Sequence, residues 1–208
     1  DLSIDRAALV KTIFNGLNTV ACSPISPKSE FTSDAAQVCP AHDPAKAKSL
    51  LKEAGLGPDK PVKAKVMIST SGSGQMLPLP MNEYVQENLN AVGFDAQFEV
   101  MEWNALVTFA FQPVTGEAAT KAQVNGINIS RATVDPYSAF MRLYHSSFVS
   151  PRGANWGILK DPKLDELIDK AHTSFDRAAQ TKALADVHTY VVDQSYWVYI
   201  AHDLNPRA

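Results

Sequence analysis

The chain has 208 residues, of which 45% are apolar, with a formal net charge of −3 and a sequence pI of about 5.9. This length and composition predict one substantial hydrophobic core. The slightly acidic balance excludes a basic field for nucleic acid or for an anionic membrane, and no apolar run approaches the roughly 20 residues of a membrane span.

Hydrophobic periodicity and turn residues predict alternating helices and strands. In the first half of the chain we expect a helix from Asp5 to Gly16, a loop over 21–43, a helix from Asp43 to Gly55, a strand from Lys63 to Thr70, a helix over 80–92 and a strand from Phe94 to Val100. In the second half we expect a helix around Trp103, a strand from Val124 to Ile129, helices after Asp135 and Asp161, a helix over 177–194 and a strand from Trp197 to Ala201. The strand–helix–strand run is the unit of an open α/β sheet.

Aspartates mark the starts of five of these helices. A carboxylate at the N-cap can accept hydrogen bonds from the unpaired amides of the first turn, and a proline suits the first helical position. Asp43, Asp135 and Asp161 each precede a proline, whereas Asp5 and Asp176 do not. We expect all five to cap their helices.

Cys22 and Cys39 are the two cysteines, and they flank a polar, proline-containing loop. In an oxidising compartment they can form a disulfide, which for a loop of this size contributes about 3 kcal/mol. Two buried free thiols are the alternative, and the sequence leaves both open. No second ligand pair stands at zinc-like spacing, so we expect no metal site.

The residues carry no catalytic signature. The histidines at 42, 145, 172, 188 and 202 do not stand at HExxH spacing, and no GxSxG elbow exists. The turn over 71–74 lacks the third glycine of a dinucleotide fingerprint, which favours a plain strand-to-helix connection. We therefore expect neither enzymatic activity nor a cofactor.

Several motifs together resemble a known family. Asn155-Trp156-Gly157 is followed by Asp-Pro-x-x-Asp-x-Leu-Ile over 161–168 and by Asp-Arg at 176–177. The opening IDRAALVKTIFNGLNTVACSPISP and the helix AKAKSLLKEAG match the same pattern in the same order. The chain resembles the C-terminal part of the family 5 extracellular solute-binding proteins, the receptors of peptide, nickel and opine ABC importers.

The resemblance implies an α/β fold with a small mixed sheet flanked by helices, one lobe of a two-lobed periplasmic-binding-protein-like fold. Residues 1–208 would form a single C-terminal (second) lobe, excised from a longer chain, since DLSIDRAALV resembles neither a signal peptide nor an initiator start. A mature N-terminus left by processing is the alternative. The implied partners are the N-terminal lobe of the same protein and the permease subunits of the importer. The implied location is periplasmic or extracellular, either free as a monomer or anchored as a lipoprotein.

The resemblance places the ligand at the loop after the strand that ends near Ile129, and at the Asn155–Trp156 pair. The expected ligand-binding residues are Ser130, Arg131, Ala132, Thr133, Asn155 and Trp156. Relatives that bind free peptides place an acidic residue where this chain has Ala132, so a carboxylate for the ligand's ammonium group is missing. Arg131 stands beside it and offers a planar fork that suits a carboxylate. We therefore expect a peptide-like or carboxylate-bearing solute.

Alternatives remain at this point. Arg131 can be a surface or interlobe arginine, and Asn155 with Trp156 can simply anchor their loop to the core. An enzyme domain with an acid–base pair in a cleft would show a strongly perturbed histidine or carboxylate beside Arg131. A protein-interaction module would show a convex, polar face there.

Overall fold

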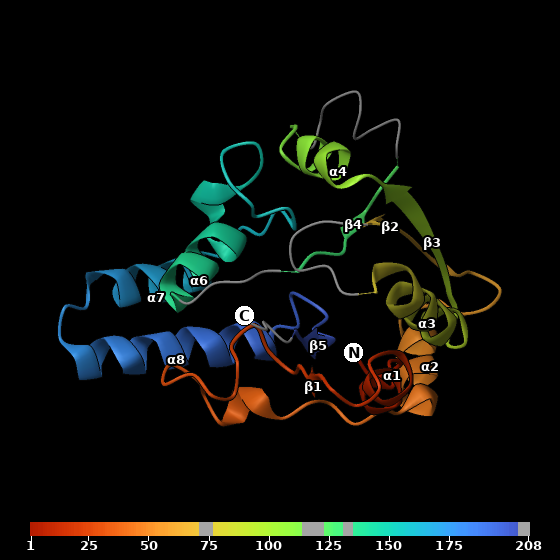
Figure 1. Cartoon of the computed structure of the whole chain (residues 1–208), viewed down its shortest axis with the longest axis horizontal. Helices are drawn as coiled ribbons and strands as arrows, with labels where there is room; N and C mark the ends of the chain where they lie inside the picture. Colours follow the sequence, from red (N-terminus) through yellow and green to blue (C-terminus); the bar gives the residue numbers. More distant parts are fainter. Residues whose placement is uncertain (71–76, 114–122, 131–134, 204–208) are drawn as a thin grey trace.

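The computed structural model describes residues 1–70, 77–113, 123–130 and 135–203, and Figure 1 shows their arrangement. The α-helices are α1 (Arg6–Ile13), α2 (Pro44–Glu53), α3 (Pro78–Asn90), α4 (Trp103–Ala110), α6 (Pro136–Tyr144), α7 (Pro162–Thr173) and α8 (Arg177–Asp193). Two 3-10 helices are η1 (Ala35–Gln37) and η2 (Ser146–Phe148), and the strands are β1 (Thr19–Val20), β2 (Val62–Ser69), β3 (Phe94–Met101), β4 (Gly126–Ile127) and β5 (Ala201–His202). Within the described ranges, no helix combines the length and the apolar character needed to cross a membrane.

All five predicted aspartate caps are confirmed. The side chains of Asp5, Asp43, Asp135, Asp161 and Asp176 each accept hydrogen bonds from amides in the first turn of the helix that follows. These bonds satisfy donors that have no partner inside the helix, which fixes where each helix begins.

Asp161 also joins the start of α7 to the far end of α8. While one carboxylate oxygen caps α7, Oδ2 accepts hydrogen bonds from the hydroxyl of Tyr190, at 2.9 Å, and from the hydroxyl of Tyr196. The hydrogen bond from Tyr196 is the main cause that lowers the pKa of Asp161. The carboxylate therefore holds three chain segments together.

The strands form two small sheets. β2 lies between β3 and β4 and runs parallel to both, while β1 pairs with β5 in an antiparallel sheet. β2 and β3 pair along their whole length, from Val62 opposite Phe94 to Ser69 opposite Met101. Helix α3 packs on β2 and β3, and α4 contacts β2. The α/β class is confirmed, and its strands are divided between two sheets.

Two predicted strands are longer than the observed ones. β4 covers only Gly126–Ile127, and the strand predicted from Trp197 is wrong over its first four residues, because β5 begins at Ala201. The carbonyl of Tyr199 accepts a hydrogen bond from Nε of the buried Arg6 at 2.6 Å. The pairing with the two-residue strand β1 extends by one further bond, from the amide of Ala21 to the carbonyl of Ile200 at 3.1 Å, so the described ladder does not reach Tyr199.

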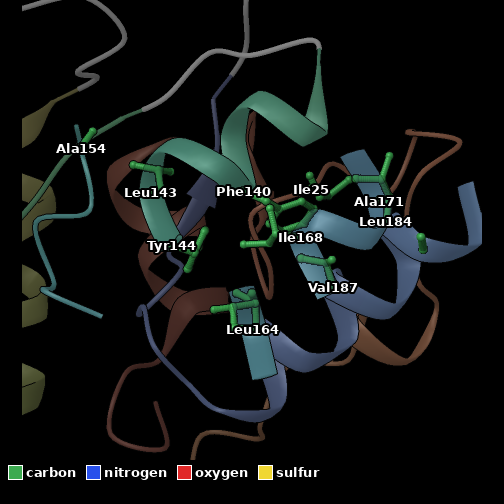
Figure 2. Packing of buried hydrophobic residues seen from close by; sticks show 12 residues of the cluster. Ile25, Phe140, Leu143, Tyr144, Ala154, Leu164, Ile168, Ala171, Leu184 and Val187 are labelled. Atoms are coloured by element: carbon green, nitrogen blue, oxygen red, sulfur yellow. The ribbon is translucent and has the colours of Figure 1, made fainter. Parts of the chain in front are cut away.

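The main hydrophobic core lies between α6, α7 and α8. Figure 2 shows Phe140 of α6 and Leu164 and Ile168 of α7 packed with Val187 of α8, and each of these side chains is fully buried. Burial of one such side chain contributes about 1.5–3 kcal/mol. In Figure 1 these three helices lie together on one side, and α1, α2, α3, β2 and β3 lie on the other.

The predicted disulfide between Cys22 and Cys39 is present, with an S–S distance of 1.93 Å. The loop that it closes contains η1 and packs against α8. The amide of Ser33 donates to Nδ1 of the buried His188 at 2.9 Å, and Ser33 Oγ lies 2.7 Å from the hydroxyl of Thr189. Because Nδ1 accepts, a neutral His188 carries its proton on Nε2.

Candidate functional site

Ser130 is the described part of the predicted ligand loop. It follows β4, and its hydroxyl donates to Oδ2 of Asp203, which follows β5, at 2.7 Å. This hydrogen bond joins the segments that leave the two sheets. Arg131, Ala132 and Thr133, like the turn over 71–74, lie outside the described residues.

Among the described residues, the hydroxyl of Ser130 is paired with a carboxylate and not with a histidine. Withdrawal from water raises the pKa of the Asp203 carboxyl, and the Ser130 hydrogen bond opposes this rise. Burial lowers the pKa of the neighbouring His202, whose Nε2 has no hydrogen-bond partner among the described residues. Ser130 therefore donates directly to a carboxylate, whereas nucleophilic serines donate to a histidine base.

Asn155 is fully buried, and its amide group is saturated by backbone partners. Its Nδ2 lies 3.2 Å from the carbonyls of Tyr144 and His145 and 2.9 Å from the carbonyl of Leu159, and its Oδ1 accepts from the amide of Leu159 at 2.9 Å. These contacts describe a loop anchor between α6 and α7. They use the side chain of Asn155 to hold the backbone of the loop, while its neighbour Trp156 is half-buried.

Close packing and a link to α4 fix the rest of this loop. Ser150 Oγ lies 2.8 Å from the carbonyl of Ala110 and 2.9 Å from that of Gln112, at the end of α4. Gly153 has no room for a side chain, because a Cβ there would stand 2.6 Å from Cβ of Phe148 and 2.7 Å from its carbonyl oxygen. The backbone of the loop between η2 and α7 is therefore fixed at Ser150 and at Gly153.

Trp156 is half-buried and contacts the end of α4. Its ring meets Phe111 edge-on, with 5.7 Å between ring centroids and an interplanar angle of 81°. Its Nε1 is buried and has no hydrogen-bond partner in the described ranges, an arrangement that costs about 1–3 kcal/mol. Of the two residues of the predicted Asn–Trp pair, Trp156 is the one that lines a cavity.

This cavity has a volume of about 1070 Å³ and lies between the three-stranded sheet and its surrounding helices. Its walls are mainly apolar and come from α2, α3, the sheet, the end of α4 and the segment before β5. Ligand pockets usually measure about 300–1,000 Å³ and combine apolar walls with a few polar groups. By size and composition, this cavity is the candidate ligand pocket of the described chain.

The residues of α2 and α3 that line the cavity were not among the predicted ligand-binding residues. A signal was present, since Ala47, Leu50 and Leu51 recur at helical spacing. Such a stripe normally faces a core, and in α2 no residue is buried, with Leu50 44% exposed. The stripe faces the cavity instead.

Solved structures share this fold. The chain matches the dipeptide-binding protein of a Pseudoalteromonas species in complex with Met-Leu, with a TM-score of 0.80 and 21% identity, over 96% of this chain and 38% of that chain. It matches DppA of Helicobacter pylori in complex with the peptide STSA with a TM-score of 0.78 and 18% identity, over 96% and 36% of the two chains. The fold is that of a lobe of a periplasmic binding protein.

The sequence also shows the family. Residues 1–150 match the family described as bacterial extracellular solute-binding proteins, family 5 Middle. Because this match covers more than half of the chain, the chain belongs to that family, and the resemblance drawn from its motifs is confirmed.

Curated relatives extend over the whole chain. Di/tripeptide-binding protein 2 of Pseudomonas aeruginosa is 25% identical over 205 residues, which are 98% of this chain and 36% of that protein. Oligopeptide-binding protein AppA of Bacillus subtilis is 25% identical over an alignment of 214 positions, which covers 99% of this chain and 38% of that protein. The chain therefore spans between a third and two fifths of the length of these relatives.

Proposed function

We propose that residues 1–208 form the second, C-terminal lobe of a longer receptor that serves an ABC importer. The receptor captures a small peptide-like or carboxylate-bearing solute in the cleft between this lobe and the N-terminal lobe of the same protein. Hinge closure of the two lobes encloses the solute, and the closed receptor delivers it to the permease subunits in the membrane. The receptor binds and releases its solute without chemical change.

The observation that carries this proposal is the family match over residues 1–150. It is supported by the ligands named for relatives of the same fold, which include a nonapeptide, Ni(L-His) and agropinic acid. These ligands differ in chemistry, since they are a peptide, a nickel complex and an organic acid. The Cys22–Cys39 disulfide favours an oxidising compartment. We therefore place the receptor in the periplasm or at the cell surface, as a monomer that is either free or anchored as a lipoprotein.

The proposed ligand contacts follow from side-chain chemistry. Arg131 would bind a carboxylate of the solute through two parallel hydrogen bonds, with Ser130 and Thr133 as neighbouring hydroxyl groups. Ala132 provides no carboxylate for an ammonium group. Trp156 would stack on the solute, and Asn155 would hold that tryptophan in place through its bonds to the loop backbone.

A thermal-shift screen of the longer receptor tests the proposal. The panel contains free peptides, opine-like acids, glutathione and a nickel complex. A solute that binds only the native state raises the unfolding midpoint in a concentration-dependent way. We expect a shift with an acidic solute, its loss in Arg131→Ala, and its retention in Arg142→Ala, which removes an exposed arginine of α6.

The outcomes separate the parts of this proposal. A shift with free peptides that survives Arg131→Ala would contradict the acid anchor and keep the receptor function. Chemical conversion of a panel compound by the receptor would contradict the non-enzymatic role. The absence of a shift with every compound would argue against the receptor function itself.

A further inference from the structure

The cavity beside Trp156 presents apolar surface from three directions. Helix α2 contributes Leu50 and Leu51, α3 contributes Val85 and Leu89, and the three-stranded sheet contributes Val66 and Phe98. An amphipathic helix is normally stabilised by covering its apolar stripe with other apolar groups. In α2 that stripe is only partly covered in the described chain, because Ala47 and Leu51 are half-buried and Leu50 is 44% exposed. The surface therefore favours an apolar occupant over water.

The cavity walls also carry little charge. Among the described wall residues, Asp1 is the only one with a charged side chain, and its carboxylate is paired with the buried guanidinium of Arg6. A charged group placed in this cavity would lose its hydration without gaining an opposite charge, which is strongly unfavourable. The walls thus select an uncharged occupant. A volume of about 1070 Å³ limits that occupant to a small molecule or to part of one.

We propose that this cavity receives the bulky, apolar and uncharged body of the solute. Trp156 and Asn128 both line the cavity, and Asn128 stands two positions before Ser130, so the cavity lies beside the segment that leads into the expected ligand loop. The part of the solute that enters the cavity would then be apolar and uncharged, and it would lie between α2, α3 and the sheet. This role rests on the proposed function, whereas the cavity's affinity for apolar molecules does not.

Binding of the neutral fluorescent probe N-phenyl-1-naphthylamine to the 208-residue chain tests the cavity directly. Its emission rises when it leaves water, so a titration gives a dissociation constant. Ala47→Trp adds bulk to the wall at α2 and should weaken binding by about tenfold or more. The matched control is Ala45→Trp, an exposed position of the same helix outside the cavity wall, which should change the constant by less than about twofold.

A second variant and a second protein keep the test decisive. Val85→Trp fills the cavity from α3 and should weaken binding in the same way if Ala47→Trp does not fold. Equal binding by the filled variants and by Ala45→Trp would overturn the proposal. Binding by this chain that disappears in the longer receptor would also overturn it, because another part of that protein would then fill the cavity.

The same titration separates the failure of this inference from that of the proposed function. Competition by an uncharged apolar compound such as N-acetyl-phenylalaninamide supports the inference, and stronger competition by free phenylalanine contradicts it. Probe binding that responds to Ala47→Trp, with no solute response in the longer receptor, would keep the cavity and reject the receptor role. A solute that needs Arg131 but tolerates Ala47→Trp would keep the receptor role and reject the cavity.

Discussion

The buried histidine of α8 makes folding stability depend on pH. His188 is fully enclosed, and Nδ1 accepts the amide hydrogen of Ser33 from the disulfide-closed loop. Burial, with a smaller contribution from His202, lowers the pKa of His188 to about 4. Protonation would put a charge in the core and convert the acceptor of the Ser33 hydrogen bond into a donor. Acid therefore weakens the attachment of this loop to α8.

The size of the effect follows from the two pKa values. The unfolded chain binds this proton with a pKa near 6.5, and the native protein with a pKa of about 4. Between these values the unfolded state holds more protons, so stability rises with pH. The contribution is complete above the unfolded pKa and is lost as the pH falls toward the folded one. From about pH 7.5 to about pH 5, His188 alone lowers the free energy of unfolding by about 2 kcal/mol.

Urea unfolding followed by circular dichroism at these two pH values measures the effect. In His188→Asn, the amide oxygen can accept from Ser33 without titrating, so the variant should lose about 2 kcal/mol less between the two pH values than the original chain. His172→Asn, at an exposed position of α7, is the matched control for the histidine-to-asparagine substitution itself. His202 is present in all three proteins, and only its smaller effect on the pKa of His188 is lost together with that residue. Equal pH dependence in His188→Asn and the original chain would refute the reasoning.

Three further changes test the supports of the fold. Replacing both Cys22 and Cys39 with serine should lower the free energy of unfolding by about 3 kcal/mol, because the disulfide restricts the unfolded chain. Equal urea midpoints for the variant and the original chain, measured without reductant, would contradict this expectation. Asp161→Ala should lower the free energy of unfolding by about 2 kcal/mol, because it removes a helix cap and the acceptor of two tyrosine hydroxyls. Asp43→Ala removes a cap without tyrosine partners, so it should lower the free energy of unfolding by about 1 kcal/mol in the same urea titration. Gly153→Ala should destabilise by about 1–3 kcal/mol and shift the tryptophan emission spectrum, since the loop must move to admit a methyl group; an unchanged spectrum and stability would show that the loop has spare room.

The helix starts could be predicted because their cause is local. Asp5 reaches the amide of Ala8, and Asp43 reaches that of Lys46, so the signal and the structure lie within four residues. The βαβ run was equally readable, since alternation and helical spacing follow each other along the chain. The disulfide pairing was limited to one possibility by the presence of two cysteines, and only its formation was open.

The strand ends and the cavity depend on contacts that a local pattern does not contain. Arg6 and Tyr199 are 193 positions apart, and β5 pairs with β1 from the opposite end of the chain, so no local pattern shows where β5 begins. The candidate site shows the same limit. Asparagine suits both a ligand contact and a loop anchor, and only the four backbone contacts of Asn155 distinguish these roles.

Trp156 lies between the helical core of α6, α7 and α8 and the end of α4. Its neighbour Asn155 bonds to carbonyls at the end of α6, which belongs to the helical core. On the other side, Phe111 contacts the indole and Ser150 bonds to carbonyls at the end of α4, which packs on the sheet strand β2. A displacement of the helical core relative to the three-stranded sheet must therefore move the indole or break these bonds. Because the same ring lines the cavity, an occupant that presses on Trp156 acts on the contact between the two parts.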